Sequence, residues 1–179
     1  MSNVKKMSCC IGLALSISMS TVSAQDLIET AGDVLQIALP LTALASTFSQ
    51  DDAAGRKALL TSYGSTFVLT HLLKNTVNKE RPNGRNTLSF PSGHTSSAFS
   101  GASFLAKRYG WDVGLPAFLA ASFVGYSRVH ADQHDWWDVT AGAAIAIGFN
   151  QWLVPDPDGV SMALMPTRGG YQLALNLQF

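Results

Sequence analysis

Three short segments in the middle of the chain carry side chains that could together hold and attack an oxyanion. They are residues 74–82 (KNTVNKERP), 91–94 (PSGH) and 127–138 (SRVHADQHDWWD). Cations can hold phosphate oxygens, one histidine can attack phosphorus, another can protonate the leaving oxygen, and a carboxylate can orient the attacking ring. With residue types about equally frequent, a string such as PSGH occurs by chance about once in 10^5 positions. Chance is therefore a poor explanation for three such blocks in one third of the chain.

The first segment offers two cations. Lys74 and Arg81 are seven residues apart, almost two helical turns, so a helix that continued through both would place them on one face. Lysine presents a point charge, whereas the guanidinium of arginine can hold two phosphate oxygens at once. A solvated helix surface is the alternative explanation of this spacing. Lys79 and Glu80 are expected to lie on other faces, in solvent.

The second segment, residues 91–94, is expected to open a helix. Ser92 is a good N-cap, and Gly93 would let a ligand approach the backbone closely. The free N–H groups and the positive end of such a helix attract anions. His94, in the first turn, is then a candidate general acid for the leaving oxygen. An ordinary capped helix start with an exposed histidine is the alternative.

The third segment is the most specific of the three. Arg128 is a third candidate phosphate ligand. His134 and Asp138 are four residues apart and are expected to stack at the start of a helix, where the carboxylate would accept the Nδ1–H and present Nε2 as a nucleophile. A purely structural His–Asp pair is one alternative. A metal site that includes His130 is another, but three nearby cations would oppose a metal ion, so none is expected.

The complete pattern resembles the signature of the type 2 phosphatidic acid phosphatase and vanadium haloperoxidase superfamily. It comprises Lys74-x6-Arg81-Pro82, Pro91-Ser92-Gly93-His94 and Ser127-Arg128-x5-His134-x3-Asp138, followed by Asp138-Val139-x-Ala141-Gly142. The resemblance covers about residues 56–154. It implies that His94 is the general acid, that His134 becomes phosphorylated and that Asp138 orients it, with no cofactor and no metal. It further implies that phosphate is bound by Lys74, Arg81, Ser92, Gly93 and Arg128.

The N-terminus has the pattern of a cleaved secretory signal. Lys5 and Lys6 precede an apolar and small-residue stretch, residues 11–20, and residues 22–24 (VSA) form a small-x-small cleavage site. The stretch is too short for a membrane anchor, since a spanning helix needs about 20 apolar residues. Residues 1–24 are therefore expected to be removed, which would leave Gln25 as the first residue of a protein exported to a bacterial periplasm.

Removal of the signal would change the composition. Both cysteines, Cys9 and Cys10, lie in it, so disulfide and thiol chemistry are excluded. Loss of Lys5 and Lys6 reduces 12 basic residues to 10 against 12 acidic ones, a formal charge of −2 that gives no sign of a nucleic-acid partner. The remaining length fits one domain with a real hydrophobic core.

The spacing of apolar residues predicts an all-α helical bundle of about five helices, over residues 26–48, 56–79, 93–109, 113–129 and 136–154. Pro40 is expected to kink the first helix, and Arg81-Pro82 to stop the second. Together they would form a helical phosphatase domain over residues 25–155. The longest uncharged runs, residues 34–50 and 139–155, are at the lower limit for a membrane span. A soluble bundle and a membrane bundle both remain open.

Residues 156–179 have a different pattern. After the helix-breaking segment 155–159 (PDPDG), residues 160–165 and 171–179 flank Arg168-Gly169-Gly170, and the second stretch alternates apolar with polar residues. This period of two predicts a C-terminal β-hairpin. Because two strands cannot close a barrel, the hairpin is expected to cap the helices or to pair between subunits in a homo-oligomer.

These features predict an exported, metal-independent phosphatase that acts through a phosphohistidine intermediate. The first expectation for its substrate is a lipid-linked phosphate monoester or diphosphate, such as phosphatidate or undecaprenyl diphosphate, with association to the membrane. A broad-specificity soluble acid phosphatase for small molecules is the next. A vanadate-dependent haloperoxidase and a non-catalytic envelope protein are the remaining alternatives.

Overall fold

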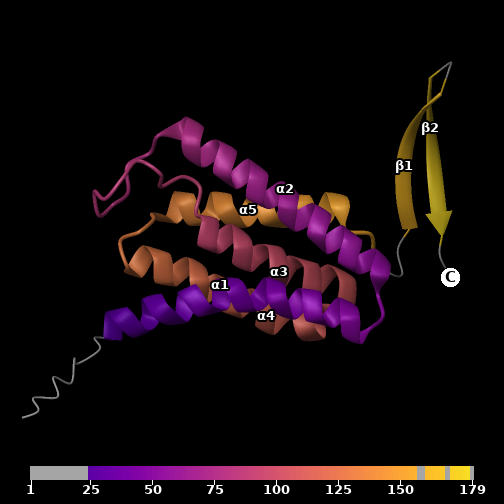
Figure 1. Ribbon diagram of the computed structural model, residues 1–179. Helices are drawn as coiled ribbons and strands as arrows, with labels where there is room; N and C mark the ends of the chain where they lie inside the picture. The colour runs from indigo at the N-terminus through magenta and orange to yellow at the C-terminus, as the bar shows by residue number, and fades with distance from the viewer. Residues whose placement is uncertain (1–23, 157–159, 168–169, 178–179) are drawn as a thin grey trace, which may run out of the picture.

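The computed structural model describes residues 24–156, 160–167 and 170–177. The predicted signal lies almost wholly outside these residues and stays a prediction. Within them the chain forms five helices (Figure 1), which confirms the predicted helical bundle. The helices are α1 (Ala24–Ser49), α2 (Ala53–Val77), α3 (Gly93–Tyr109), α4 (Trp111–His130) and α5 (Trp136–Leu153).

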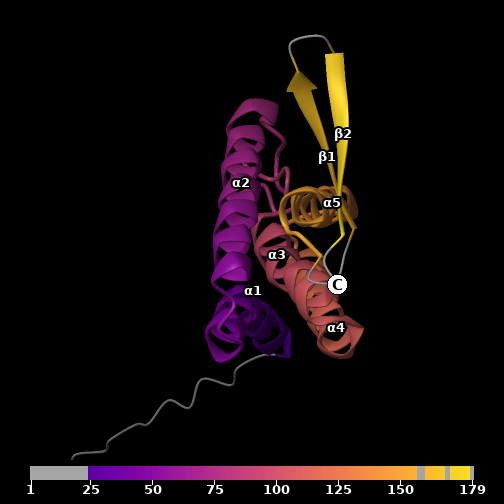
Figure 2. The same cartoon turned by 90° about the vertical axis from the view of Figure 1, so that its right-hand side faces the viewer.

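Helix α3 is the centre of the bundle. It packs against each of the other four helices, as the two views show (Figures 1 and 2). Its sequence is rich in serine, alanine and glycine, and small side chains let neighbouring backbones approach closely. Phe104 and Leu105 add bulk to the buried core near its C-terminal end. The N-terminus of α3, where the PSGH segment lies, is thereby surrounded by elements from the whole domain.

Local chemistry explains where the second helix begins and ends. Asp52 caps the N-terminus of α2, and its side chain accepts a hydrogen bond from the amide of Gly55 at 2.7 Å. Asn78 adopts a left-handed conformation with φ of 50°, which ends the helix after Val77. The prediction that a helix carries Arg81 on the same face as Lys74 is therefore wrong, because Arg81 lies in the following loop.

The C-terminus requires a correction to the predicted fold class. Strands β1 (Val160–Thr167) and β2 (Gly170–Leu177) pair antiparallel, with Val160 opposite Leu177. Within the described residues, however, neither strand contacts any helix (Figure 1), so the prediction of a hairpin that caps the bundle is wrong. Two strands without a packing partner are at best marginally stable in water. The packed fold is the five-helix bundle alone.

The outside of the bundle is unusually apolar. Large hydrophobic side chains are exposed on α1, α2, α4 and α5, and include Trp137 at 77% and Trp152 at 79% exposed. Among the described residues, one helix, over Asp26–Ser49, is long and apolar enough to cross a membrane. Exposed apolar side chains of this kind are typical of surfaces that contact a protein partner, a ligand or a membrane.

The closest approach of α1 to α3 yields a stability prediction. A Cβ atom on Gly101 of α3 would lie 2.6 Å from the backbone of Leu39 and Pro40. We expect Gly101→Ala to lower the free energy of unfolding by about 1–3 kcal/mol, because backbone must move to admit the methyl group. Gly64→Ala on α2 is the matched control, since nothing lies within 4 Å of the added atom. It should stabilise by up to about 1 kcal/mol through helix propensity, and denaturant unfolding measures both.

Candidate active site

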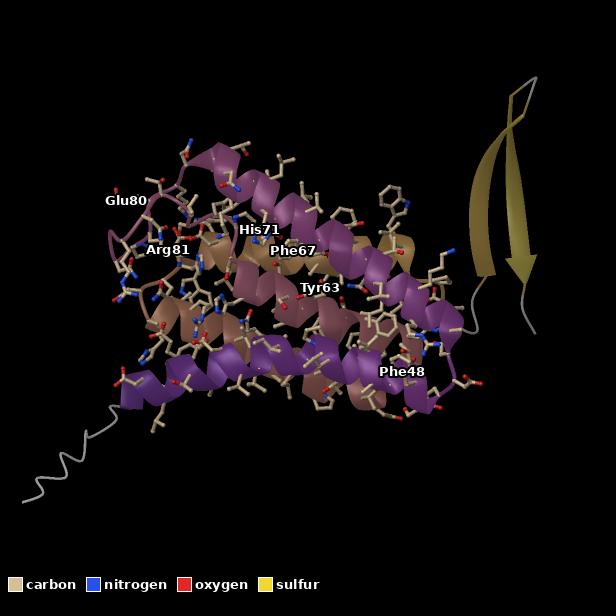
Figure 3. The ribbon with its side chains drawn as sticks, in the orientation of Figure 1. Phe48, Tyr63, Phe67, His71, Glu80 and Arg81 are labelled. Atoms are coloured by element: carbon tan, nitrogen blue, oxygen red, sulfur yellow. The ribbon has the colours of Figure 1, made fainter. Side chains whose placement is uncertain are left out.

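A cavity of about 300 Å³ lies where α2, α3, the loop after α2 and the loop before α5 meet. Its wall includes five of the eight predicted site residues: Lys74, Arg81, Gly93, His94 and His134. Tyr63, Phe67 and His71 continue this wall along the side of α2 that faces the other helices (Figure 3). The other three predicted residues, Ser92, Arg128 and Asp138, are buried next to the wall rather than part of it.

Both nitrogens of the His134 ring have polar partners, and the hydroxyl of Ser89 also lies 3.5 Å from Nδ1. Nδ1 lies 3.4 Å from Oδ2 of Asp138, and Nε2 lies 3.3 Å from Nη1 of Arg81. Arginine can only donate, so Nε2 is the unprotonated nitrogen and Nδ1 carries the proton. His134 precedes α5 instead of lying within it, since the helix begins at Trp136. The lone pair of Nε2 is thus directed to the Arg81 side of the cavity.

The electrostatic surroundings keep His134 neutral. Burial, followed by the positive charges of Arg81 and Lys74, lowers the pKa of His134 to about 4. Asp138 acts in the opposite direction but does not compensate. At neutral pH the ring is therefore uncharged, which is the form that can act as a nucleophile.

Asp138 is fully buried and is satisfied by several donors. Besides His134, its carboxylate accepts hydrogen bonds from Nζ of Lys79 at 2.8 Å, from the hydroxyl of Ser89 and from the amide of Asp135 at 3.2 Å. Asp135 is the N-cap of α5 and completes a capping box with Asp138. The carboxylate therefore fixes the first turn of α5 and the loop that follows α2 in one place.

Lys79 is part of the candidate site, which sequence reasoning missed. Its ammonium lies 2.6 Å from Asp135 and 2.8 Å from Asp138, so the prediction of a solvated Lys79 is wrong. The cause is the early end of α2 at Val77, after which the chain turns toward α5. A signal existed in the sequence, because a carboxylate placed in a buried His–Asp pair needs a cationic partner.

Lys74 and Arg81 are positioned by neutral acceptors. Lys74 donates to the carbonyl oxygens of Leu88 at 2.8 Å and Pro91 at 2.9 Å. Arg81 donates to the side chain of Asn86 at 2.9 Å and to the carbonyl of Gln133 at 3.1 Å. Neither cation is paired with a carboxylate at hydrogen-bond distance in the part of the chain that the structure describes. Their charge is thus available to an anion in the cavity.

The N-terminus of α3 adds backbone donors to the cavity. Ser92 caps the helix, and its hydroxyl accepts from the side chain of Thr95 at 2.9 Å. The Ser92 amide donates to the carbonyl of Asp138 at 2.9 Å, which ties α3 to α5. A Cβ atom on Gly93 would find nothing within 4 Å, so the space above its backbone is open. The positive end of the helix can therefore approach a bound oxyanion.

Arg128 and His94 share an acceptor that the sequence did not reveal. Nη1 of Arg128 lies 2.7 Å from Oδ1 of Asp33, and Nε2 of His94 lies 3.1 Å from the same oxygen. Nη2 of Arg128 donates to the carbonyl of Glu29 at 2.7 Å, and Nε donates to Ser127 at 3.1 Å. Both acidic residues belong to α1, which lies outside the three motif segments.

The arrangement as a whole suits phosphoryl chemistry. A neutral imidazole, two unpaired cations and a helix N-terminus converge on one cavity that can hold a phosphate group. The described residues contain no group of three or more His, Cys, Asp or Glu side chains that could hold a metal ion.

Comparison with known proteins finds a matching family model and several similar proteins. A family model described as the PAP2 superfamily matches residues 57–158, more than half of the chain. A lipid A 4′-phosphatase from Helicobacter pylori is 44% identical over 70 residues, which are 39% of this chain and 35% of the relative. A lipid A 1-phosphatase from Porphyromonas gingivalis is 39% identical over 71 residues, which are 37% of this chain and 16% of the relative. The chain thus spans only a minor part of the length of these two proteins.

Two crystal structures have a similar fold. LpxE from Aquifex aeolicus matches with a TM-score of 0.63 and 25% identity, over 73% of this chain and 84% of that one. A transmembrane PAP2-type phosphatidylglycerolphosphate phosphatase from Bacillus subtilis matches with a TM-score of 0.61 and 21% identity, over 75% of this chain and 77% of that one. The second match establishes the fold only. The resemblance inferred from the motifs is confirmed by the family match.

The geometry around His134 predicts its titration. In the free protein, NMR of the imidazole should give a pKa near 4, well below the ordinary value of 6.5. Arg81→Gln should raise this pKa, because it removes the nearest positive charge, while burial of the ring remains. An unchanged pKa for His134 in the variant would contradict the electrostatic assignment.

Proposed function

Because the chain belongs to the PAP2 superfamily, we propose that it is a phosphatase that hydrolyses a lipid-linked phosphate monoester or diphosphate through a phosphohistidine intermediate. One observation carries the proposal: the neutral, buried His134 faces a cavity lined by the unpaired cations Lys74 and Arg81. Such a cavity attracts a phosphoryl group and holds it next to a nucleophile.

In the first step the phosphoryl group lies between Lys74, Arg81 and the amide of Gly93. The lone pair of Nε2 on His134 attacks phosphorus, and the bond from phosphorus to the leaving oxygen breaks. His94 donates a proton to that oxygen, so the leaving group departs as an alcohol or a phosphate.

In the second step a water molecule attacks the phosphohistidine. His94, now neutral, accepts a proton from the water, and the bond between phosphorus and Nε2 breaks. Asp138 holds the Nδ1–H throughout and stabilises the positive charge that the ring carries while it is phosphorylated. Arg128 adds positive charge next to His94, and its guanidinium is the third candidate ligand for a phosphate oxygen.

A second cavity favours a lipid-linked substrate over a small molecule. It has a volume of about 390 Å³, lies between α1 and α2 and shares Gln36, Tyr63 and Ser97 with the phosphate cavity. The remaining wall is apolar and consists of Ile37, Pro40, Leu41, Leu44, Leu59 and Leu60. An acyl or prenyl chain attached to the phosphate can lie in this groove while the phosphate is at the site.

The apolar exterior supports action at a membrane. Helices α1 and α2 diverge toward the end that holds the phosphate cavity (Figure 1), so the groove opens between two helices with exposed apolar side chains. Trp136 and Trp137 are exposed near this end, and Trp152 is exposed near the opposite end of α5. Tryptophan is enriched at both surfaces of a bilayer. We therefore place the protein at a membrane, where its substrate would reach the groove from the lipid phase.

His134→Ala should lower turnover by about 10^4-fold or more, as loss of a covalent catalyst does. Enzyme quenched in acid-free denaturant during turnover of a 32P-labelled substrate should carry label on His134 that is stable in base and labile in acid. His71→Ala is the control, since it removes another cavity histidine that has no role in the proposed steps. Near-normal activity in His134→Ala, or label retained in that variant, would refute the mechanism.

The apolar groove predicts that a substitution in its wall changes the preference between lipid and small-molecule substrates. Leu60→Glu introduces a charge into its wall and should lower the ratio of long-chain phosphatidate hydrolysis to p-nitrophenyl phosphate hydrolysis by about 10-fold, the equivalent of about two methylene groups removed from apolar surroundings. Leu119→Glu places the same charge on the exposed surface of α4 and should leave the ratio unchanged. Equal ratios in the two variants would show that the chain of the substrate binds elsewhere.

A further inference from the structure

Helix α1 supplies a carboxylate to the site although it lies outside the segment that matches the family model, residues 57–158. Oδ1 of Asp33 is 3.1 Å from Nε2 of His94 and 2.7 Å from Nη1 of Arg128. One oxygen therefore contacts both the group that is proposed to donate the proton and the cation buried beside it. Asp33 takes no part in the two proposed steps.

Close packing fixes the position of Asp33. A Cβ atom on Gly32 would lie 2.0 Å from Oγ of Ser127 and 3.0 Å from Nη2 of Arg128, so the backbone of α1 presses directly on the end of α4. One turn earlier, the carbonyl of Glu29 accepts from Arg128 at 2.7 Å, and its side chain accepts from Gln133 at 3.2 Å. The turn from Glu29 to Asp33 is thus anchored to α4 and to the loop that carries His134.

We propose that Asp33 is a positioning residue that orients His94 and favours its doubly protonated, proton-donating form. The inference rests on the proposed function. In the first step the Nε2–H of His94 stays bonded to Asp33, and the Nδ1–H is transferred to the leaving oxygen as its bond to phosphorus breaks. The neutral ring then has a free lone pair on Nδ1, which takes a proton from the attacking water in the second step. Each catalytic cycle returns His94 to its charged state.

The other charges around His94 explain why such a partner is needed. The pKa of His94 lies below its ordinary value, because burial, then Arg128 and more weakly Arg81, lower it by more than the charge and hydrogen bond of Asp33 raise it. Lys74 shares the cavity and adds positive charge on the side of α2. Without Asp33, His94 would face cations from α2, α4 and the loop after α2, and its neutral form would be favoured still more.

The contact between Asp33 and Arg128 also allows an opposite role, in which Asp33 inhibits the reaction. Asp33 could instead occupy the place of a phosphate oxygen next to Arg128 and compete with the substrate. Its removal would then free the cations, tighten the binding of inorganic phosphate or vanadate, and raise the catalytic efficiency. The two roles predict changes of opposite sign when Asp33 becomes neutral.

The test compares Asp33→Asn with Asp112→Asn in the full chain. Asp112 is exposed in the first turn of α4, at the other end of that helix from Arg128. Its substitution should leave the activity and the titration of His94 unchanged. For Asp33→Asn we expect turnover of an alkyl phosphate to fall about 10-fold or more at neutral pH, and turnover of p-nitrophenyl phosphate to fall less than about 3-fold, since its leaving group needs little protonation. The alkaline limb of the pH–rate profile should move to lower pH, because activity is lost as His94 deprotonates.

A second measurement does not depend on activity. NMR of the His94 imidazole in the free protein should show a lower pKa in Asp33→Asn than in the wild type, with no change in Asp112→Asn. Asp33→Glu, which keeps the charge, should restore part of the wild-type titration. Absence of phosphatase activity in the wild-type protein would refute the proposed function. The titration of His94 would then still test whether Asp33 raises the pKa of that ring. An unshifted His94, equal losses with both leaving groups, or tighter phosphate binding in Asp33→Asn would each overturn the inference.

Discussion

The buried carboxylate of Asp138 is the constraint on which the site depends. A charge removed from water costs several kcal/mol unless donors replace the lost solvent. Lys79 and Ser89 from the loop after α2, and the amide of Asp135, provide these donors. To reach Asp138, the loop must fold back over the start of α5. This path of the chain places Arg81 in the same cavity as Lys74 and His134. The need of one buried carboxylate for hydrogen-bond donors therefore brings together the cationic side chains that a phosphate would need.

The sequence predicted the parts of the site that local chemistry determines. The third helix was predicted over residues 93–109, as observed, because Ser92 is a strong N-cap and Gly110 a strong stop signal. The end of α2 was misplaced, since the left-handed conformation of Asn78 is not evident from its type alone. This two-residue error accounts for the prediction of a solvated Lys79, whereas a common helical face for Lys74 and Arg81 would require a helix that continues beyond even its predicted end at Lys79.

Contacts between distant segments were the part that the sequence could not provide. Asp33 is far from His94 and Arg128 in the chain, and nothing in the pattern of α1 distinguishes it from a solvated acidic residue in an apolar helix. Its place follows from the packing of Gly32 against Ser127, a tertiary contact. The C-terminal strands show the same limit, because alternation predicts pairing of two strands but says nothing of what they pack against.

The two histidines of the cavity need opposite protonation states, although burial and nearby cations lower the pKa of both. At His134 the influence of Asp138 is divided among Lys79, Ser89 and a backbone amide, so burial and the nearby cations keep the ring neutral. At His94 the carboxylate of Asp33 is closer to the ring and works against the cations. A bound phosphoryl group adds negative charge beside both rings, which favours protonation of His94, whereas the Nε2 lone pair of His134 is then taken up by phosphorus. Substrate binding is therefore coupled to proton uptake by His94. His134, in contrast, is already neutral and able to act as a nucleophile before the substrate binds.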